Sequence, residues 1–126
     1  MGDAGVGIQV ESGIDGDLYR KVLGRYPTGV TLVTGMGDGE PLAMVIGSFV
    51  SVSMDPPLVG FLPGRDSQTW PLIQASGSFC INVLSDAQED LSNAFFRKDG
   101  DPWEGTGWVP AASGSPAIPS CLASID

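Results

Sequence analysis

Apolar residues at helical spacing open the patterned part of the chain. They follow Asp17 and comprise Leu18, Val22, Leu23 and Tyr26. Asp15 or Asp17 can cap the start of this helix, and Pro27 prevents its continuation. The spacing therefore predicts a helix of about two to three turns, preceded by a flexible, Gly-rich leader over residues 1–16.

β-branched and alternating residues then predict a run of strands. Residues 29–34 are β-branched, residues 37–39 are typical of a turn, and residues 41–53 predict one long second strand. Asp55-Pro56-Pro57 breaks the sheet, because proline cannot donate to a ladder, and residues 58–62 resume it. This half of the chain is expected to contain an antiparallel hairpin.

The middle of the chain alternates loop, helix and strand. A polar loop at residues 63–67 leads into a helix near residues 71–75, which Gly77 stops. Residues 78–84 are mostly apolar and predict a buried strand.

A capping box predicts the next helix. Ser85 is followed three residues on by Gln88, ahead of apolar positions that end at Phe95 and Phe96. Residues 122–125 predict a last strand with nothing after it to pair. Hairpin strands with helices between them indicate a mainly β domain over residues 17–126, an antiparallel barrel with helical decoration whose C-terminal strands are missing.

The charge balance restricts the possible partners. The chain has 126 residues, 15 acidic against 6 basic, and a formal net charge of −9. Long-range attraction to nucleic acid or to an anionic membrane is therefore not expected. The basic side chains are so few that the position of each is informative.

Histidine and cysteine usage excludes several chemistries. The chain has no histidine, which removes Ser-His-Asp and Cys-His arrangements and the common zinc sites, so no metal site is expected. Cys80 lies in an apolar run far from Cys121, which favours a buried free thiol over a disulfide. The N-terminus has no signal-peptide pattern and no apolar stretch is long enough to cross a bilayer, so we expect a cytoplasmic protein.

Two stretches have the residues to hold a planar anion. In residues 63–69, Arg65, Ser67 and Thr69 offer a guanidinium and two hydroxyls just ahead of a helix, as suits a phosphate; plain N-capping is the alternative. In residues 44–53, a glycine and three serines could let a flat ring approach the backbone; a sheet interior with paired hydroxyls is the alternative.

Four stretches together give the chain a resemblance to a known family, the flavin reductase-like domains with the FMN-binding split barrel. They are residues 19–31 (YRKVLGRYPTGVT), 48–59 (SFVSVSMDPPLV), 67–71 (SQTWP) and 77–84 (GSFCINVL). The resemblance covers about residues 17–126. It implies an antiparallel split barrel that forms a homodimer and binds FMN or FAD near the subunit interface.

The resemblance also implies an activity and a set of site residues. NADH or NADPH would reduce the flavin, and the reduced flavin would serve a partner monooxygenase. No side chain is then needed as an acid or base, because hydride transfer belongs to the two cofactors. The flavin site would comprise Thr28, Met44, Val45, Ile46, Gly47, Ser48, Ser51, Val52, Ser53, Arg65, Ser67, Thr69 and Phe95.

Two other functions stay open at this stage: a flavin-binding module that only carries the cofactor, and a partial barrel that acts as an interaction domain. FMN against FAD, NADH against NADPH, and the monooxygenase served also stay open. Members of the family normally continue for about 40 more residues, with closing strands and a histidine near the nicotinamide. We therefore expect a chain that retains much of the flavin pocket and loses much of the reductase rate.

Overall fold

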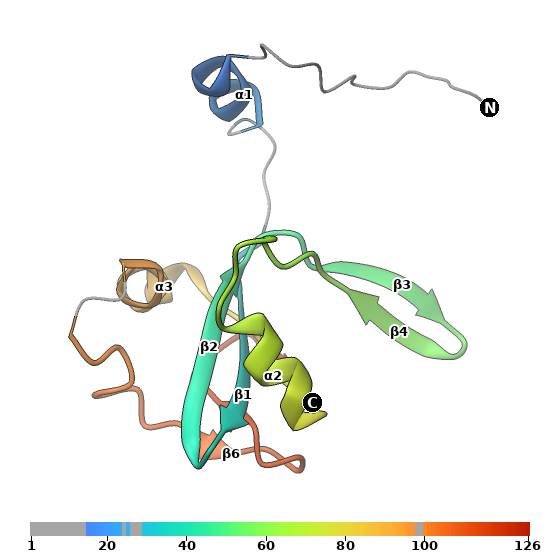
Figure 1. Cartoon of the computed structure of the whole chain (residues 1–126), viewed down its shortest axis with the longest axis vertical. Coiled ribbons are helices and arrows are strands. Elements are labelled where there is room, and N and C mark those ends of the chain that lie inside the picture. Colours follow the sequence, from blue (N-terminus) through green and yellow to red (C-terminus); the bar gives the residue numbers. More distant parts are fainter. Residues whose placement is uncertain (1–14, 24, 26–28, 98–99) are drawn as a thin grey trace.

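A computed structural model describes residues 15–23, 25, 29–97 and 100–126. The described chain is mainly β with helices (Figure 1). Its largest sheet has four strands in the order β2 (Glu40–Ile46), β1 (Thr31–Gly37), β5 (Cys80–Val83) and β8 (Ala123–Ile125). Two further sheets have two strands each, β3 (Val50–Met54) with β4 (Pro57–Gly60), and β6 (Val109–Pro110) with β7 (Pro116–Ala117). These described sheets do not close into a barrel.

Strands β1 (Thr31–Gly37) and β2 (Glu40–Ile46) form the predicted hairpin. Asp38 and Gly39 connect them with φ angles of 52° and 80°, the left-handed conformations that a tight two-residue hairpin requires. Strand β1 extends three residues beyond the expected end at residue 34, because the ladder continues to the turn.

Strand β5 (Cys80–Val83) lies on the other side of β1, and β8 (Ala123–Ile125) completes the sheet. The expectation that the last strand would have no partner is wrong, since β8 pairs antiparallel with β5 from Ile81↔Ile125 to Val83↔Ala123. The partner is an earlier strand, about 40 residues back in the chain, which local patterning could not identify.

Both faces of this sheet are covered. On one face Leu32 packs with Leu84, Phe95 and Ile118, and Phe95 comes from helix α3 (Glu89–Arg97). On the other face a second cluster contains Val33, Ile46 and Ile81, with partly buried aromatic residues against it. The sheet is therefore the core that positions the loops around it.

Helix α2 (Trp70–Ser76) covers the second face through Ile73, which is buried over Gly35. A Cβ on Gly35 would lie 3.0 Å from the Ile73 Cγ2 atom, so the glycine permits this close approach. Gly77 ends the helix in a left-handed conformation, as predicted.

The capping box ahead of α3 is also confirmed. The Ser85 N–H donates to Gln88 Oε1 at 2.9 Å, and the Ser85 side chain faces the Gln88 backbone N–H in return. The first turn, Asp86–Gln88, is a 3₁₀ helix that leads directly into α3.

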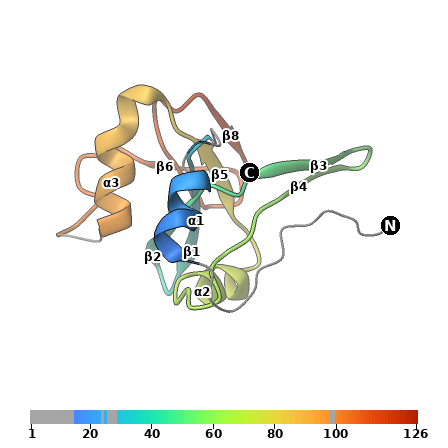
Figure 2. The same ribbon diagram turned by 90° about the horizontal axis from the view of Figure 1, so that it is seen from above.

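The predicted single strand over residues 41–53 is instead two strands. Strand β2 ends at Ile46, and β3 (Val50–Met54) begins a separate hairpin with β4 (Pro57–Gly60). We call residues 48–62 the arm, since this hairpin extends away from the four-stranded sheet in both views (Figures 1 and 2). At its base, Ser48 Oγ accepts from Leu62 N at 2.8 Å.

Asn82 joins the short β6 (Val109–Pro110) and β7 (Pro116–Ala117) hairpin to the core. Its fully buried side chain donates to the carbonyls of Leu32 and Pro116, at 3.2 and 3.3 Å, and accepts from Ile118 N at 2.8 Å. This hairpin was missed by sequence patterning, because two-residue strands carry no periodic signal.

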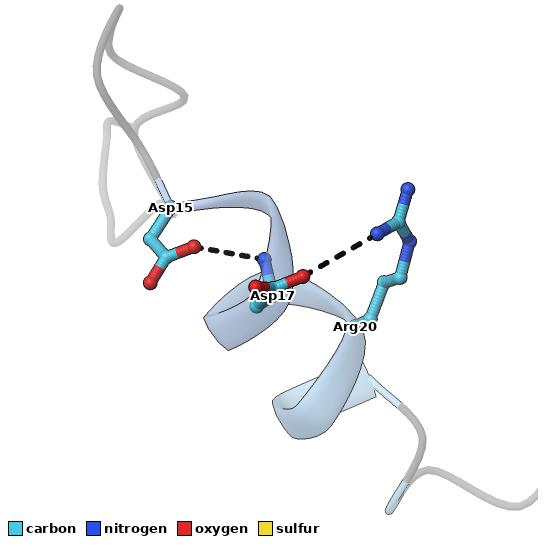
Figure 3. Close-up of polar contacts among 3 residues, drawn as sticks. All are labelled: Asp15, Asp17 and Arg20. Atoms are coloured by element: carbon cyan, nitrogen blue, oxygen red, sulfur yellow. Dashed lines mark hydrogen bonds and ion pairs between the residues drawn. The ribbon is translucent and has the colours of Figure 1, made fainter.

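Helix α1 (Gly16–Leu23) matches the predicted first helix in part. Asp15 Oδ1 accepts from Asp17 N at 2.9 Å at its start, and Arg20 lies 3.6 Å from Asp17 in an exposed ion pair (Figure 3). The leader up to residue 14, and Tyr26, Pro27 and Thr28, lie outside the described residues. Within the described helices, none is long and apolar enough to cross a membrane.

Candidate functional site

A cavity of about 340 Å³ lies beside the outer strand of the four-stranded sheet. It is lined by residues 43–46 of β2, by Gly64 and residues 66–69 of the loop before α2, and by Phe95 and Phe96 of α3. Successive side chains of a strand point to opposite faces of a sheet. A cavity that touches four consecutive residues must therefore lie against the edge of the sheet.

Some backbone groups of β2 point outward from the free edge of the sheet. Pro41 lies opposite Met36 on β1 and has no N–H to donate. The two residues therefore form a non-hydrogen-bonded pair of the antiparallel ladder. The antiparallel alternation then gives Ala43 and Val45 the same orientation, with N–H and C=O pointing away from β1. No other described strand pairs with β2 on that side, so these groups are available to a ligand.

The walls next to these groups are largely apolar. Met44 and Ile46 pack into one core cluster of the sheet, and Val45 and Phe95 into the other. Phe95 is only 6% exposed and forms an edge-to-face pair with Trp103 at 4.8 Å between ring centroids. Phe95 is therefore a core residue that also lines the cavity.

The two hydroxyl side chains of the loop before α2 differ in their hydrogen bonding. Ser67 Oγ accepts from Trp70 N at 3.1 Å, so this side chain caps the first turn of α2. Thr69 makes no side-chain cap bond, although it occupies the N-cap position, and its side chain makes no hydrogen bond with the described residues. Thr69 is therefore the hydroxyl of the cavity that is available to a ligand.

Two charged side chains of the loop lie at the cavity or next to it in sequence. Arg65 is exposed between two lining residues and forms no ion pair with the described chain. Asp66 lines the cavity itself and would repel an anion placed against it. A phosphate at this loop would be attracted by Arg65 and repelled by Asp66.

The structure divides the expected site residues into two groups. Met44, Val45, Ile46, Ser67, Thr69 and Phe95 come together around the cavity. Ser51, Val52 and Ser53 lie on the arm, and Ser48 holds its base; Gly47 is an exposed bend between β2 and the arm. Thr28 lies outside the described residues.

Five lining residues were not named as site residues from the sequence. They are Ala43, Gly64, Asp66, Gln68 and Phe96. Phe96 directly follows Phe95 on α3, and consecutive residues of a helix point about 100° apart. Phe95 is buried and Phe96 is 75% exposed.

A second cavity, of about 610 Å³, lies near the start of α3 and includes Asp86 and Glu89. It shares no residue with the first cavity, and none of the expected site residues that the structure describes lines it. Within the described part of the chain, no group of three acidic or cysteine side chains could hold a metal ion.

A mainly β domain with a cavity at a free strand edge, walled by apolar residues and by a hydroxyl-bearing loop, defines a binding domain for a flat, partly anionic ligand. The profile of the flavin reductase-like domain family matches residues 23–126. The chain belongs to this family.

Known relatives agree with this assignment. The chain is 49% identical over 118 residues to a flavin reductase from Pseudomonas putida, covering 93% of this chain and 69% of that protein. It is similar to nitrilotriacetate monooxygenase component B from Mycobacterium thermoresistibile, with 41% identity and a TM-score of 0.85. That match covers 91% of this chain and 64% of the other, so the chain spans about two thirds of the length of these relatives.

A third similar structure was solved with ligands. It is the Streptomyces globisporus NADH:FAD oxidoreductase SgcE6 in complex with NAD and FAD fragments. The identity is 34% and the TM-score 0.77, over 94% of this chain and 72% of that one.

Proposed function

We propose that this chain binds FMN or FAD in the cavity beside β2 and that the flavin is reduced there by NADH. The single observation that carries the proposal is the free backbone edge at Ala43 and Val45, which faces a cavity with apolar walls. A flavin supplies the redox chemistry when it is bound, by accepting a hydride at N5 from the C4 atom of the nicotinamide.

The residues of the cavity fit an isoalloxazine. Such a ring is flat and apolar on its faces and carries hydrogen-bonding atoms along its edge, so it needs apolar walls and a row of polar groups. Met44 and Phe95 supply apolar wall, and the backbone N–H and C=O groups of Ala43 and Val45 supply the row. Because the positions of the strand fix these groups, the chain would hold and orient the ring without a catalytic acid or base.

The name of the Streptomyces globisporus relative, an NADH:FAD oxidoreductase, favours NADH over NADPH as the hydride donor. A comparison of the two donors under equal conditions tests this point.

We propose a homodimer whose contacts include the arm. A two-stranded hairpin is at best marginally stable alone, and this one exposes several apolar side chains. They are Val50, Val52, Met54, Leu58, Val59 and Leu62. A second copy placed over the arm would bury them and would bring Ser51 and Ser53 to the rim of a flavin site. Closure of the sheets into a split barrel belongs to the same proposal.

The partner would be a monooxygenase that takes the reduced flavin, as in two-component systems, and the protein would work in the cytoplasm. The name of the Mycobacterium thermoresistibile relative, a monooxygenase component, supports this proposal. The 17–126 domain boundary also stays a proposal, with residues 1–16 as its leader.

Binding is tested by titrating FMN into the Arg65→Ala/Thr69→Ala double variant. Loss of the guanidinium and of the free hydroxyl should weaken binding by about 2–4 kcal/mol, since charge-assisted hydrogen bonds contribute about 1.5–3 kcal/mol each. Ser67 is left in place because it caps α2. Ser124→Ala on β8 is the matched control for an exposed hydroxyl outside the cavity. An unchanged FMN affinity in the double variant would remove this loop from the site.

Reduction is tested separately by adding NADH to the FMN complex without oxygen. Loss of the visible flavin absorbance, followed by release of the reduced flavin, supports the reductase function. A flavin that stays bound and oxidised would favour the alternative of a module that only carries the cofactor.

A further inference from the structure

Two neighbouring phenylalanines on α3 meet the same cavity in different ways. Phe95 is buried at 6% exposure, whereas Phe96 is 75% exposed, although both line the cavity. Consecutive residues of a helix point about 100° apart, so one ring forms part of the wall and the next stands at the mouth. Phe96 adds nothing to the core clusters of the sheet.

The volume of the cavity leaves part of a larger ligand outside. At about 340 Å³ it is near the lower end of the range for small-molecule sites, roughly 300–1,000 Å³. A ring system with a short chain fits such a volume. The second half of a dinucleotide would have to pass over the mouth, where Phe96 stands.

Two arginines adjoin lining residues in sequence. Arg97 follows Phe96, and Arg65 follows Gly64 on the loop that forms the other side. Both arginines are exposed and neither forms an ion pair with the described residues. An exposed aromatic ring flanked by a guanidinium suits a purine joined to a pyrophosphate, because the ring can stack on the base and the guanidinium can bind the phosphates.

We propose that Phe96 is the stacking platform for the adenine of a dinucleotide bound in this cavity, with Arg97 beside its pyrophosphate. The proposal rests on the proposed flavin and nicotinamide binding and adds a subsite to it. Adenine is shared by FAD and by NADH, so the experiment has one arm for each source.

The test compares Phe96→Leu, which keeps an apolar side chain, with Phe96→Trp, which keeps a stacking ring. Tyr19→Leu is the matched control, since Tyr19 is an exposed aromatic residue on α1 outside the cavity lining. Dissociation constants are measured by fluorescence for FMN and FAD. They are then measured, with FMN saturating, for NAD⁺ and for nicotinamide mononucleotide, which has no adenine.

The expected result for Phe96→Leu is a loss of about tenfold in affinity for FAD, for NAD⁺ or for both, according to which adenine uses the platform. FMN and nicotinamide mononucleotide should bind within about twofold of the unmodified chain, because they lack the stacked base. Phe96→Trp should retain the affinity for the dinucleotide, and Tyr19→Leu should change none of the four constants.

Three results would overturn the proposal. The first is unchanged binding of both FAD and NAD⁺ by Phe96→Leu, and the second is a loss for FMN as large as that for FAD. The third is a changed sedimentation coefficient with unchanged dinucleotide binding, which would mean that another protein copy covers Phe96. If the unmodified chain fails to bind FMN at all, the proposed function itself fails, and this outcome is distinct from the other three.

Discussion

The four-stranded sheet and the arm are made from similar residues but have opposite surroundings. Strand β1 has five consecutive buried residues, Thr31–Gly35, whereas β3 has exposed Val50, Val52 and Met54, the last at 90%. The difference lies in what covers the strands, because α2 and α3 pack on the sheet, whereas the arm contacts the core and α2 only at its base, through Phe49 and Phe61. An apolar, β-branched sequence thus predicts a strand but not its burial.

The comparison predicts very different costs for polar substitutions in the two regions. Asn82→Ala would leave the Ile118 N–H without its buried acceptor and would remove the side-chain bonds to the Leu32 and Pro116 carbonyls, although Pro116 keeps Thr34 Oγ1 as a donor. We expect a loss of about 2–4 kcal/mol in the free energy of unfolding, since a buried group left unpaired costs about 1–3 kcal/mol. Urea unfolding measures it. Ser53→Ala on the arm is the control and should stay within about 0.5 kcal/mol, so equal losses in both variants would contradict the comparison.

Alkaline pH should lower the free energy of unfolding, because the thiol of Cys80 ionises more readily in the unfolded chain. Burial, followed by the charges of Asp126 and Cys121, raises the pKa of this thiol from 9.0 to about 11. The folded state therefore keeps the proton that the unfolded chain begins to lose at about pH 9. The contribution of the protonated thiol to the free energy of unfolding is complete below pH 9. It decreases by roughly 2 kcal/mol as the pH rises to about 11.

The pH dependence is isolated by comparing the unmodified chain with Cys80→Ala at each pH. The difference in unfolding free energy between them should shrink or change sign as the pH rises from 9 to 11. A constant difference over this range would show that Cys80 does not titrate between the two states.

Packing of α2 on β1 gives a smaller expected effect. Gly35→Ala would place a methyl 3.0 Å from Ile73 Cγ2 and 3.4 Å from the Ser78 carbonyl oxygen, so Ile73 has to shift. We expect a loss of about 1–2 kcal/mol in stability from overpacking. Gly29→Ala is the matched control, because its added Cβ meets nothing within 4 Å. A thermal melt in which both variants match the unmodified chain would mean that the helix does not pack this closely.

The arm should show the smallest effect on stability and a clear effect on assembly. Val52→Thr/Met54→Gln keeps side-chain size while making two exposed positions polar. Folding stability at low protein concentration should change by less than about 0.5 kcal/mol. Sedimentation at higher concentration should shift from dimer to monomer, because the apolar contact surface is reduced. A dimer that survives the double substitution would place its interface elsewhere.

Local signals in the sequence were sufficient for most elements. The turn at Asp38 and Gly39, the capping box at Ser85 and the stop at Gly77 each depend on neighbouring residues, and the structure confirms them. The division of residues 41–53 into β2 and the arm depends on which strand each half pairs with. Such pairing is a tertiary property that a β-branched run does not encode.

The candidate site was predictable to a similar extent. Small and hydroxyl residues drew attention to Ser67 and Thr69, and the resemblance added Met44, Val45, Ile46 and Phe95. Ala43 and Phe96 were missed, because one contributes backbone and the other is an exposed ring whose value depends on a nearby cavity. Neither property has a local sequence pattern.

The most direct test of the central claim is an NMR titration of the isotope-labelled chain with FMN, in which each backbone amide reports its own surroundings. We predict that the amides of Ala43, Val45 and Thr69 shift and gain protection from exchange, because the ring binds the free edge of β2 beside the loop. Amides around the second cavity, such as those of Asp86 and Glu89, should stay unchanged. Shifts confined to that second cavity or to the arm, with Ala43 and Val45 unaffected, would contradict the account.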